Sequence, residues 1–233
     1  RLHEAARRGT LLSGVPVVSM MNGADAFDVA ALVSDLVAIE TENPPGNERP
    51  CAKFVAEWFD AHGVYAELVP EPDPERPQVG VSVGTGDPTV VLNGHLDVVP
   101  AADSLFTTRY IDEGELSGRG TADMKGGLAA MMHVVRDLSR RESPPSLALF
   151  VVTDEERGGH HGARYLLDEV GYDPAFCITG EPNNLDGYMD IVNRQKGVIR
   201  IDLSTTGESA HAATPEYGEN AIAKLMAAYP AIE

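Results

Sequence analysis

Apolar residues recur along the chain with two different spacings, and these spacings predict its elements. Residues 26–40 and 48–62 carry apolar side chains at helical intervals, which predicts two amphipathic helices. Further along, short runs of consecutive apolar residues alternate with helical patterns, as in strands that are buried on both faces. We therefore predict an α/β fold with a mostly parallel sheet flanked by helices. The expected strands cover residues 64–69, 78–83, 89–93, 147–152 and 175–179, and the further helices cover residues 124–138 and 160–169.

The pattern changes near residue 188, and we divide the chain into domains 23–187 and 188–233. In the second domain, residues 198–204 alternate between apolar and polar side chains, which predicts a half-exposed strand of a different sheet. A helix is predicted over residues 219–228. One strand and one helix bury too little apolar surface to be stable alone, so we interpret this domain as incomplete.

The first 22 residues precede the first convincing helix. They contain an arginine pair, Arg7 and Arg8, ahead of a short apolar stretch. Gly14 and Pro16 break this stretch, which makes it a poor export signal. We interpret residues 1–22 as a non-native leader and expect a cytoplasmic protein.

Composition narrows the classes of partner. The 36 acidic and 18 basic residues give a formal charge of −18, which disfavours nucleic acids and anionic membranes. No apolar stretch approaches the length of about 18 residues that a membrane-spanning helix needs. The acid-rich, lysine-poor composition resembles that of halophilic proteins, and an ordinarily acidic cytosolic enzyme is the alternative. Two cysteines are too few for a disulfide framework, and Cys177 is predicted to be a small core residue.

Four segments that carry acids or imidazole follow apolar runs, where the functional groups of parallel sheets gather. They contain His95 and Asp97, Asp123, residues 154–156, and Glu181. Two of these segments have ordinary explanations when they are considered singly. A His-x-Asp spacing is often incidental, and Asp123 could cap the following helix. The three adjacent carboxylates of residues 154–156 repel one another unless solvent or a cation neutralises them. Together the four segments predict a site for divalent metal ions.

The spacing within two of these segments allows a division of roles. The carboxylate two positions after His95 can accept the second ring N–H and so fix the tautomer of the imidazole. In the pair Glu155 and Glu156, one glutamate can ligate a metal while its neighbour accepts a proton.

Four motifs resemble those of the acetylornithine deacetylase, succinyl-diaminopimelate desuccinylase and carboxypeptidase G2-type family of co-catalytic zinc hydrolases: GHLDVVP at 94–100, GRGTADMKGG at 118–127, DEE at 154–156 and GEP at 180–182. The similarity covers roughly residues 27–233. It implies a zinc-exopeptidase-like catalytic domain with an inserted α+β lid or dimerisation domain. The implied activity is metal-dependent hydrolysis of an amide bond in an N-acyl amino acid or small peptide, such as deacetylation or desuccinylation. A dipeptidase or carboxypeptidase of the same chemistry is an alternative.

The resemblance also implies a set of metal ligands. Asp123 bridges two divalent ions, with zinc as the first expectation and cobalt as the alternative. His95 and Glu181 complete the protein ligands of one ion, and Glu156 binds the other ion.

Three further residues are implied to act in catalysis. Asp97 orients His95, and Glu155 is the general base that takes a proton from the water between the ions. His211 lies in the segment 207–215, which resembles the lid domain, and reaches the active site of a partner subunit, where it stabilises the developing oxyanion. The resemblance thus implies a homodimer, and an exposed loop residue is the alternative for His211.

Family members are longer than this chain and supply a late histidine to the second metal. The sequence contains no residue that corresponds to this histidine. The alternative to an active hydrolase is therefore a truncated, catalytically inactive fragment that binds at most one metal.

Overall fold

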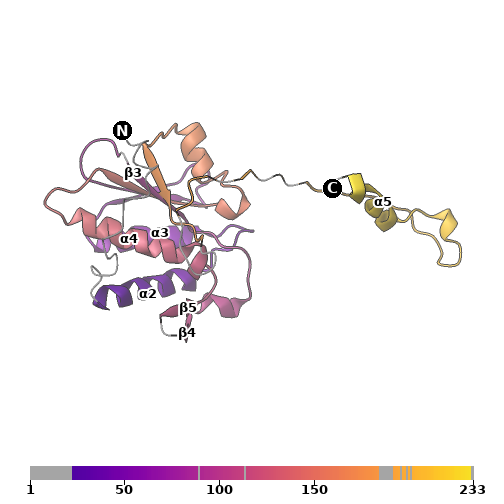
Figure 1. Cartoon of the computed structure of the whole chain (residues 1–233), viewed down its shortest axis with the longest axis horizontal. Coiled ribbons are helices and arrows are strands. Elements are labelled where there is room, and N and C mark those ends of the chain that lie inside the picture. The colour runs from indigo at the N-terminus through magenta and orange to yellow at the C-terminus, as the bar shows by residue number, and fades with distance from the viewer. Residues whose placement is uncertain are drawn as a thin grey trace, which may run out of the picture. The chain divides into compact units, whose positions relative to one another are not determined.

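The computed structural model describes residues 23–231 apart from residues 89, 113, 184–190, 195, 198 and 200. The chain divides into two compact units, Arg1–Met189 and Asp190–Glu233, which are described separately. The leader predicted over residues 1–22 lies outside the described residues. In the larger unit the elements are α2 (Gly23–Ala38), α3 (Arg49–Ala61), β1 (Ala66–Val69), β2 (Gln78–Val83), β3 (Val90–His95), β4 (Arg109–Asp112), β5 (Glu115–Ser117), α4 (Gly126–Ser139), β6 (Leu147–Val152) and β7 (Phe176–Thr179), shown in Figure 1.

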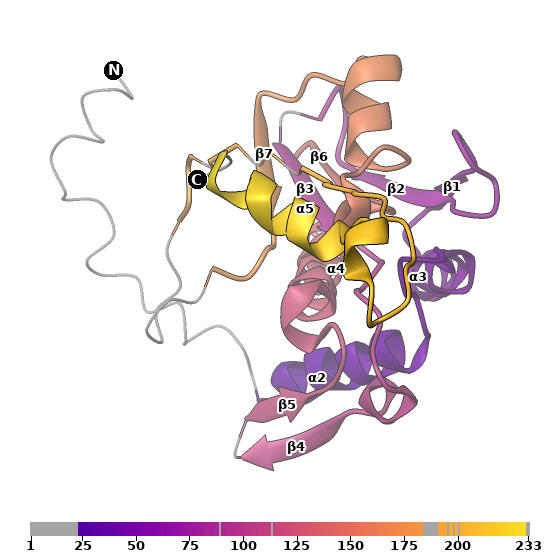
Figure 2. The same ribbon diagram turned by 90° about the vertical axis from the view of Figure 1, so that its right-hand side faces the viewer.

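Five strands form one sheet in the order β1-β2-β6-β3-β7, with β1 and β7 at its edges (Figure 2). β3 lies between β6 and β7 and runs parallel to both, whereas β2 runs antiparallel to β1 and to β6. The sheet is therefore mixed: the predicted parallel arrangement holds for β3, β6 and β7, whereas β2 runs in the opposite direction. The reason is the short connections on either side of β2, which reverse the chain without a crossover helix.

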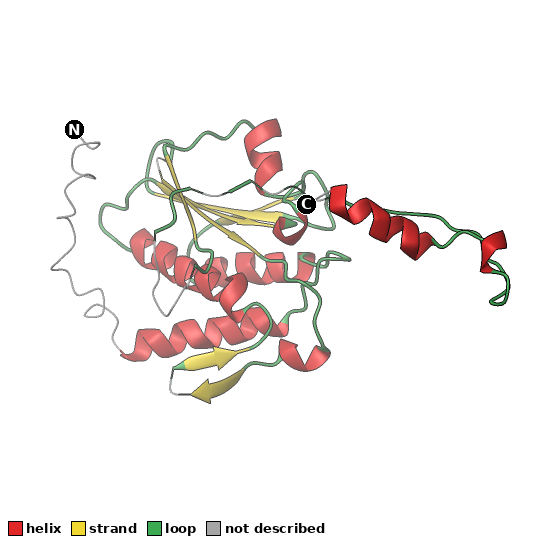
Figure 3. Ribbon diagram, turned by 45° about the vertical axis from the view of Figure 1, so that its right-hand side comes forward, coloured by secondary structure: helices red, strands yellow, loops and turns green. Residues whose placement is uncertain are grey.

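Helices cover one face of this sheet in two layers. α3 and α4 pack on the strands, and α2 packs against α4 (Figure 3). The apolar positions of α3 recur at helical spacing and face inward, where they join the side chains of the sheet. The core contains Leu36, Val55, Phe59, Leu128 and Leu149 among other buried residues.

The edge strand β7 departs from the expectation of a sheet buried throughout. Phe176 is 66% exposed and Ile178 is 55% exposed. Cys177 is also exposed, so its prediction as a small core residue is wrong. A short apolar run has the same pattern in a central strand and in an edge strand, and only the neighbours of the strand decide its burial.

Two further segments differ from the predictions. The hairpin of β4 and β5 has no counterpart among the predicted strands. In the smaller unit the helix α5 (Ala221–Ala228) agrees with the predicted helix, but the described residues 199 and 201–204 form no strand. A strand needs a partner to pair with, and the described residues of this unit contribute only the isolated bridge between Glu208 and Glu219. No described helix has the length and apolarity needed to cross a membrane.

Candidate metal centre

Three parallel strands end at one edge of the sheet, where His95, Glu155, Glu156 and Glu181 lie at or just after the strand ends. His95 is the last residue of β3 and lies beside Val152, the last residue of β6. Glu155 and Glu156 follow β6 after two residues, and Glu181 follows β7 after one. Because the carboxyl ends of neighbouring parallel strands meet at the same edge, residues far apart in the sequence come together here.

Asp123 reaches the same place from the turn Thr121–Lys125, which directly precedes α4. No side-chain hydrogen bond caps the start of α4, and the carboxylate of Asp123 instead contacts the ring of His95. The turn is anchored by Lys125, which is fully buried and donates hydrogen bonds of 2.9 Å to the main-chain oxygens of Leu36 and Ile39. The ordinary explanation of Asp123 as a helix cap therefore does not hold.

A close approach of two glycines brings α4 beside the segment that carries Glu181. A Cβ atom added to Gly127 would collide with the main-chain oxygen of Gly180. Glycine at this position thus lets the first turn of α4, which follows Asp123, pack against the residue before Glu181.

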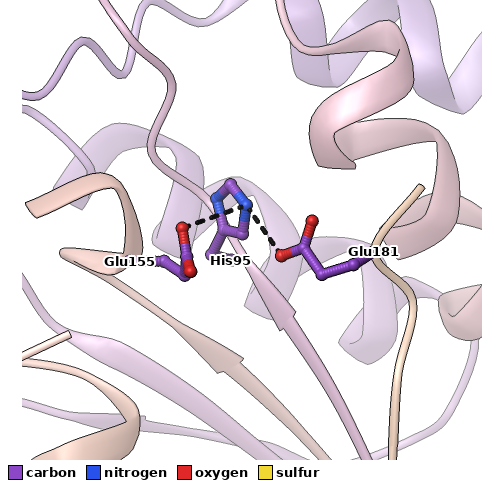
Figure 4. Close-up of side chains that lie close together, drawn as sticks. All are labelled: His95, Glu155 and Glu181. Carbon is purple, nitrogen blue, oxygen red and sulfur yellow. Dashed lines mark ion pairs between the residues drawn. The ribbon is translucent and has the colours of Figure 1, made fainter. Parts of the chain in front are cut away.

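The imidazole of His95 is the centre of the cluster. Its Nε2 atom lies 3.0 Å from Oδ1 of Asp123, 3.2 Å from Oε1 of Glu181 and 3.9 Å from Oε2 of Glu155. Figure 4 shows the ring between Glu155 and Glu181. The side chain of His95 is 1% exposed, whereas those of the three carboxylates are between 38% and 55% exposed. A buried nitrogen donor thus faces a group of carboxylates that open toward solvent.

The side chains form two possible donor sets for a metal ion, His95 with Glu155 and Glu181, and His95 with Asp123 and Glu156. Within each set the ligand atoms lie within 4.8 Å of one another. The resemblance had placed Asp123 with His95 and Glu181, and Glu155 outside the ligands as a base. The structure brings all five predicted side chains together, and the role of each single residue stays a prediction.

The carboxylate of Asp97 lies near the ring of His95 but makes shorter contacts elsewhere. Nδ1 of His95 lies 2.8 Å from the main-chain oxygen of Asp97 but 3.5 Å from its carboxylate, so the main-chain oxygen is the better acceptor. The carboxylate instead accepts hydrogen bonds of 3.1 Å from the backbone N–H groups of Glu155 and Glu156. Asp97 therefore fixes the turn that carries both glutamates.

Three residues that support this turn had no role in the sequence predictions. Asn43 donates to Asp97 and Asp154, and Arg76 pairs with Asp154 at 3.1 Å and with the buried Glu48. Arg76 thus neutralises one of the three adjacent carboxylates, which leaves the other two to face the site. No local pattern marks Asn43, Arg76 or Glu48, because their partners are distant in the sequence.

His211 belongs to the smaller unit. It is exposed and lies in a turn, where its Nδ1 accepts a hydrogen bond of 3.1 Å from the backbone N–H of Ala213. Its role in the site of a partner subunit stays a prediction.

The carboxylates change the proton affinity of the buried imidazole. Burial by itself lowers the pKa of His95, but contacts with Asp97 and Glu181 outweigh burial and raise the pKa to about 11. For Asp97 both effects act on the pKa in the opposite direction. Burial raises its pKa, but hydrogen bonds from His95 and Asn43 outweigh burial and hold the pKa below its ordinary value. In the metal-free site the positive charge of His95 thus partly compensates the acids.

The other carboxylates of the cluster have raised pKa values. Burial raises the pKa of Asp123, and the charge of Glu181 adds to this effect. Burial also raises the pKa values of Glu155 and Glu156, where nearby carboxylates contribute. Raised carboxyl pKa values mean that the surroundings disfavour the ionised carboxylates, and a divalent cation bound among them would stabilise that ionised form.

We expect the metal-free protein to lose stability as the pH rises above about 6.5. The pKa of His95 is 6.5 in its ordinary state and about 11 in the folded protein, so the folded state holds this proton more tightly. The resulting stabilisation is complete below pH 6.5 and is lost as the pH rises toward 11, by up to about 1.4 kcal/mol per pH unit. Urea unfolding in the presence of a chelator at several pH values measures this slope.

The substitution His95→Gln is the control for this slope, because it removes the titrating ring and should flatten the dependence. Saturating metal should reverse the trend, since protons compete with the metal for His95. A metal-free stability that stays constant or rises between about pH 6.5 and 8.5 would contradict the prediction.

Comparison with known families and proteins identifies relatives of the chain. Residues 91–232 match the model of peptidase family M20/M25/M40. A probable succinyl-diaminopimelate desuccinylase from Staphylococcus aureus strain Mu50 is 31% identical over 207 residues, which cover 85% of this chain and 50% of that protein. An acetylornithine deacetylase from Proteus mirabilis is 33% identical over 174 residues, which cover 72% of this chain and 44% of that protein. The chain spans about half the length of the curated relatives it matches.

Solved structures with low sequence identity share the fold. A tripeptidase from Staphylococcus aureus superposes with a TM-score of 0.58 at 20% identity, over 88% of this chain and 56% of that chain. A dinuclear metal binding peptidase of the M20 family from Bacillus subtilis superposes with a TM-score of 0.51 at 16% identity, over 68% of this chain and 43% of that chain. At these identities the superpositions establish the fold alone.

Proposed function

The chain belongs to peptidase family M20/M25/M40, and on this premise we propose that it is part of a metal-dependent amidohydrolase. Its substrate is an N-acyl amino acid or a small peptide, and the reaction is hydrolysis of the amide bond. The observation that carries the proposal is the convergence of His95 with Asp123, Glu155, Glu156 and Glu181 at the carboxyl ends of three parallel strands. The names of the curated relatives, which include a desuccinylase and a deacetylase, support the acyl substrates.

The residues present fit two divalent ions in their chemistry. Imidazole nitrogen and carboxylate oxygen are both zinc ligands, and cobalt accepts the same donors. Burial raises the pKa values of Asp123, Glu155 and Glu156, and neighbouring carboxylates add to this effect, so a divalent cation at this position would stabilise their ionised forms. The solved dinuclear peptidase from Bacillus subtilis supports the number of ions.

Each residue then has a task that follows from its contacts. When bound, two divalent ions lower the pKa of water and polarise the scissile carbonyl. Nδ1 of His95 is held by the main-chain oxygen of Asp97, so Nε2 faces the donor carboxylates. Glu155 is half-exposed, and its carboxylate takes the proton from the attacking water and returns it to the leaving amine. The carboxylate of Asp97 holds the backbone of Glu155 in place during this transfer.

A second candidate function is the binding of a single metal without turnover. Both donor sets contain the same atom, Nε2 of His95, because Nδ1 is occupied by the main-chain oxygen of Asp97. One imidazole nitrogen cannot ligate two ions independently. Within the described residues, the sharing of this nitrogen favours one tightly bound ion.

Metal titration combined with an activity panel separates the two candidates. The purified chain is freed of metal, titrated with zinc in a calorimeter, and assayed with N-acetyl and N-succinyl amino acids and with dipeptides. Turnover that appears with metal and disappears with a chelator supports the hydrolase. A stoichiometry near one with no turnover on any substrate would reject the hydrolase for this chain and support the second candidate.

We further propose that residues 188–233 belong to an α+β lid or dimerisation domain and that His211 acts in the site of a second subunit. The separation of Asp190–Glu233 as a compact unit supports a distinct domain. The two free cysteines, Cys51 and Cys177, support a reducing, cytoplasmic location.

A further inference from the structure

A chain of buried polar groups lies behind the donor carboxylates and begins at Asn43. The amide nitrogen of Asn43 lies 2.8 Å from Oδ2 of Asp97 and 3.1 Å from Oδ1 of Asp154. Asn43 is 4% exposed, Asp97 is fully buried and Asp154 is 5% exposed. Both partners are carboxylates, which only accept hydrogen bonds when ionised, so the NH₂ end of the amide must face them. One neutral donor thus bridges two buried anions.

The two bridged carboxylates both accept backbone hydrogen bonds from the segment after β6. Asp97 accepts the backbone N–H groups of Glu155 and Glu156. Asp154 is the one non-glycine residue with a positive φ, 66°, among the described residues. Its carboxylate accepts the backbone N–H of His161 at 3.3 Å and pairs with Arg76 at 3.1 Å. Left-handed backbone is unfavourable for most residues and is tolerated by aspartate when local contacts stabilise it.

The loop that carries Asn43 is itself fixed to the segment that follows His95. The backbone N–H of Asn43 donates to the main-chain oxygen of Val98 at 2.9 Å, and Val98 donates to Thr41 at 3.0 Å. Thr41 is also buried, and its hydroxyl donates to the main-chain oxygen of Leu96 at 2.7 Å. The two backbone hydrogen bonds with Val98 therefore hold Asn43 where its amide reaches the two carboxylates, and the hydroxyl of Thr41 makes a separate bond that neither of them needs.

We propose that Asn43 is a positioning residue of the metal centre, whose amide holds Asp97 and Asp154 together and thereby sets where Glu155 and Glu156 stand relative to His95. The proposal rests on the proposed metal site. It gives a function to a residue that contacts neither the donor atoms nor the open side of the cluster. Of the two bridged carboxylates Arg76 contacts that of Asp154, and among the described residues Asn43 is the side chain that donates to both.

The chain offers a matched pair of substitutions for the test. Asn43→Leu keeps the approximate shape of the side chain and removes both hydrogen bonds. Thr41→Val removes one buried hydrogen bond from the same loop and does not touch either carboxylate. Asn43→Ser is a milder variant that remains usable if Asn43→Leu fails to fold. Each variant is compared with the unaltered chain in unfolding free energy, zinc affinity and amide hydrogen exchange.

The positioning role predicts different results for substitutions at Asn43 and at Thr41. Asn43→Leu should weaken zinc binding by about 10- to 100-fold, as measured for residues that orient metal ligands. It should also speed hydrogen exchange at the backbone N–H groups of Glu155 and Glu156. Thr41→Val should lower stability with zinc affinity and these two exchange rates unchanged.

Two results would overturn the proposal. One is a zinc affinity of Asn43→Leu, or of Asn43→Ser, within about twofold of the unaltered chain. The other is an equal loss of affinity in Thr41→Val, which would show that loop stability alone is responsible. If the unaltered chain bound no zinc, the proposed function would fail, but hydrogen exchange at Glu155 and Glu156 would still decide whether Asn43 positions the turn.

Discussion

Replacing Glu155 by Gln is expected to reduce turnover by about 10²- to 10⁴-fold while metal binding persists. Glutamine has the shape of glutamate and keeps a carbonyl oxygen, but it cannot accept the proton of the attacking water at neutral pH. The carboxylate of Glu155 is half-exposed and its Oε2 lies 3.9 Å from Nε2 of His95, the longest of the three carboxylate contacts to this nitrogen. The role of a base comes from the family resemblance, and because Glu155 also belongs to one donor set, the variant decides between a base and a ligand. Steady-state hydrolysis of N-acyl amino acids and zinc calorimetry measure the two effects.

Glu181→Gln is the matched control for this variant. Glu181 belongs to the same donor set as Glu155, but its Oε1 lies only 3.2 Å from Nε2 of His95. Its substitution should weaken zinc binding, whereas Glu155→Gln should leave zinc affinity within a few-fold of the unaltered chain. If Glu155→Gln lost zinc as strongly as Glu181→Gln, Glu155 would be a ligand and the base would have to be sought elsewhere.

Replacing His95 by Gln is expected to weaken zinc binding by more than about 100-fold, the largest loss for any single residue of the cluster. His95 occurs in both donor sets and is their only nitrogen ligand, so its removal affects every metal position that the described residues can form. The carboxylates that remain suit harder cations better than zinc. Zinc at 100 times its dissociation constant should stabilise the unaltered chain by about 2.7 kcal/mol, and this stabilisation should vanish in the variant. Thermal unfolding with and without zinc measures it.

A second buried histidine provides the control for loss of packing. His133 is 6% exposed, lies in α4 and packs edge-on against Trp58. His133→Gln should lower the melting temperature in the absence of metal and leave the zinc-dependent increase intact. A zinc-dependent increase that survives in His95→Gln would show that the metal binds elsewhere.

Most elements of the larger unit could be predicted because their patterns are local. The helical spacing in α3 and the apolar runs of β3 and β6 depend on neighbours within a few residues, and both kinds of element appear where the sequence places them. Membership of the metallopeptidase family could be predicted for the same reason, since each motif is a short string of residues. The match to the family model confirms it. The direction of β2 was not predictable from its pattern, because a parallel and an antiparallel strand with one exposed face have similar side chains.

In the candidate site, too, some features follow from local sequence and others depend on distant residues. The residue types were identified from the sequence, because acids and a histidine directly after buried strands are unusual enough to indicate metal binding. The carboxylate of Asp97 was predicted as the acceptor of the ring N–H of His95, and in the structure the main-chain oxygen of the same residue lies nearer, at 2.8 Å against 3.5 Å. That carboxylate has other partners, the amide of Asn43 and two backbone N–H groups, which lie 54 or more residues away along the chain. Competition between such partners cannot be inferred from a spacing of two residues.

The sequence by itself therefore determined the family, the helices α2, α3 and α4, the strands of the five-stranded sheet, and the side chains that meet at the metal centre. Only the tertiary structure decided the mixed direction of the strands, the exposure of β7 and the support behind the glutamates. The contact between Asn43 and Asp154 spans 111 residues of sequence. Local patterns reflect periodicity and neighbouring chemistry, whereas burial and hydrogen-bond partners depend on which distant segments the fold brings within 3 Å or so of one another.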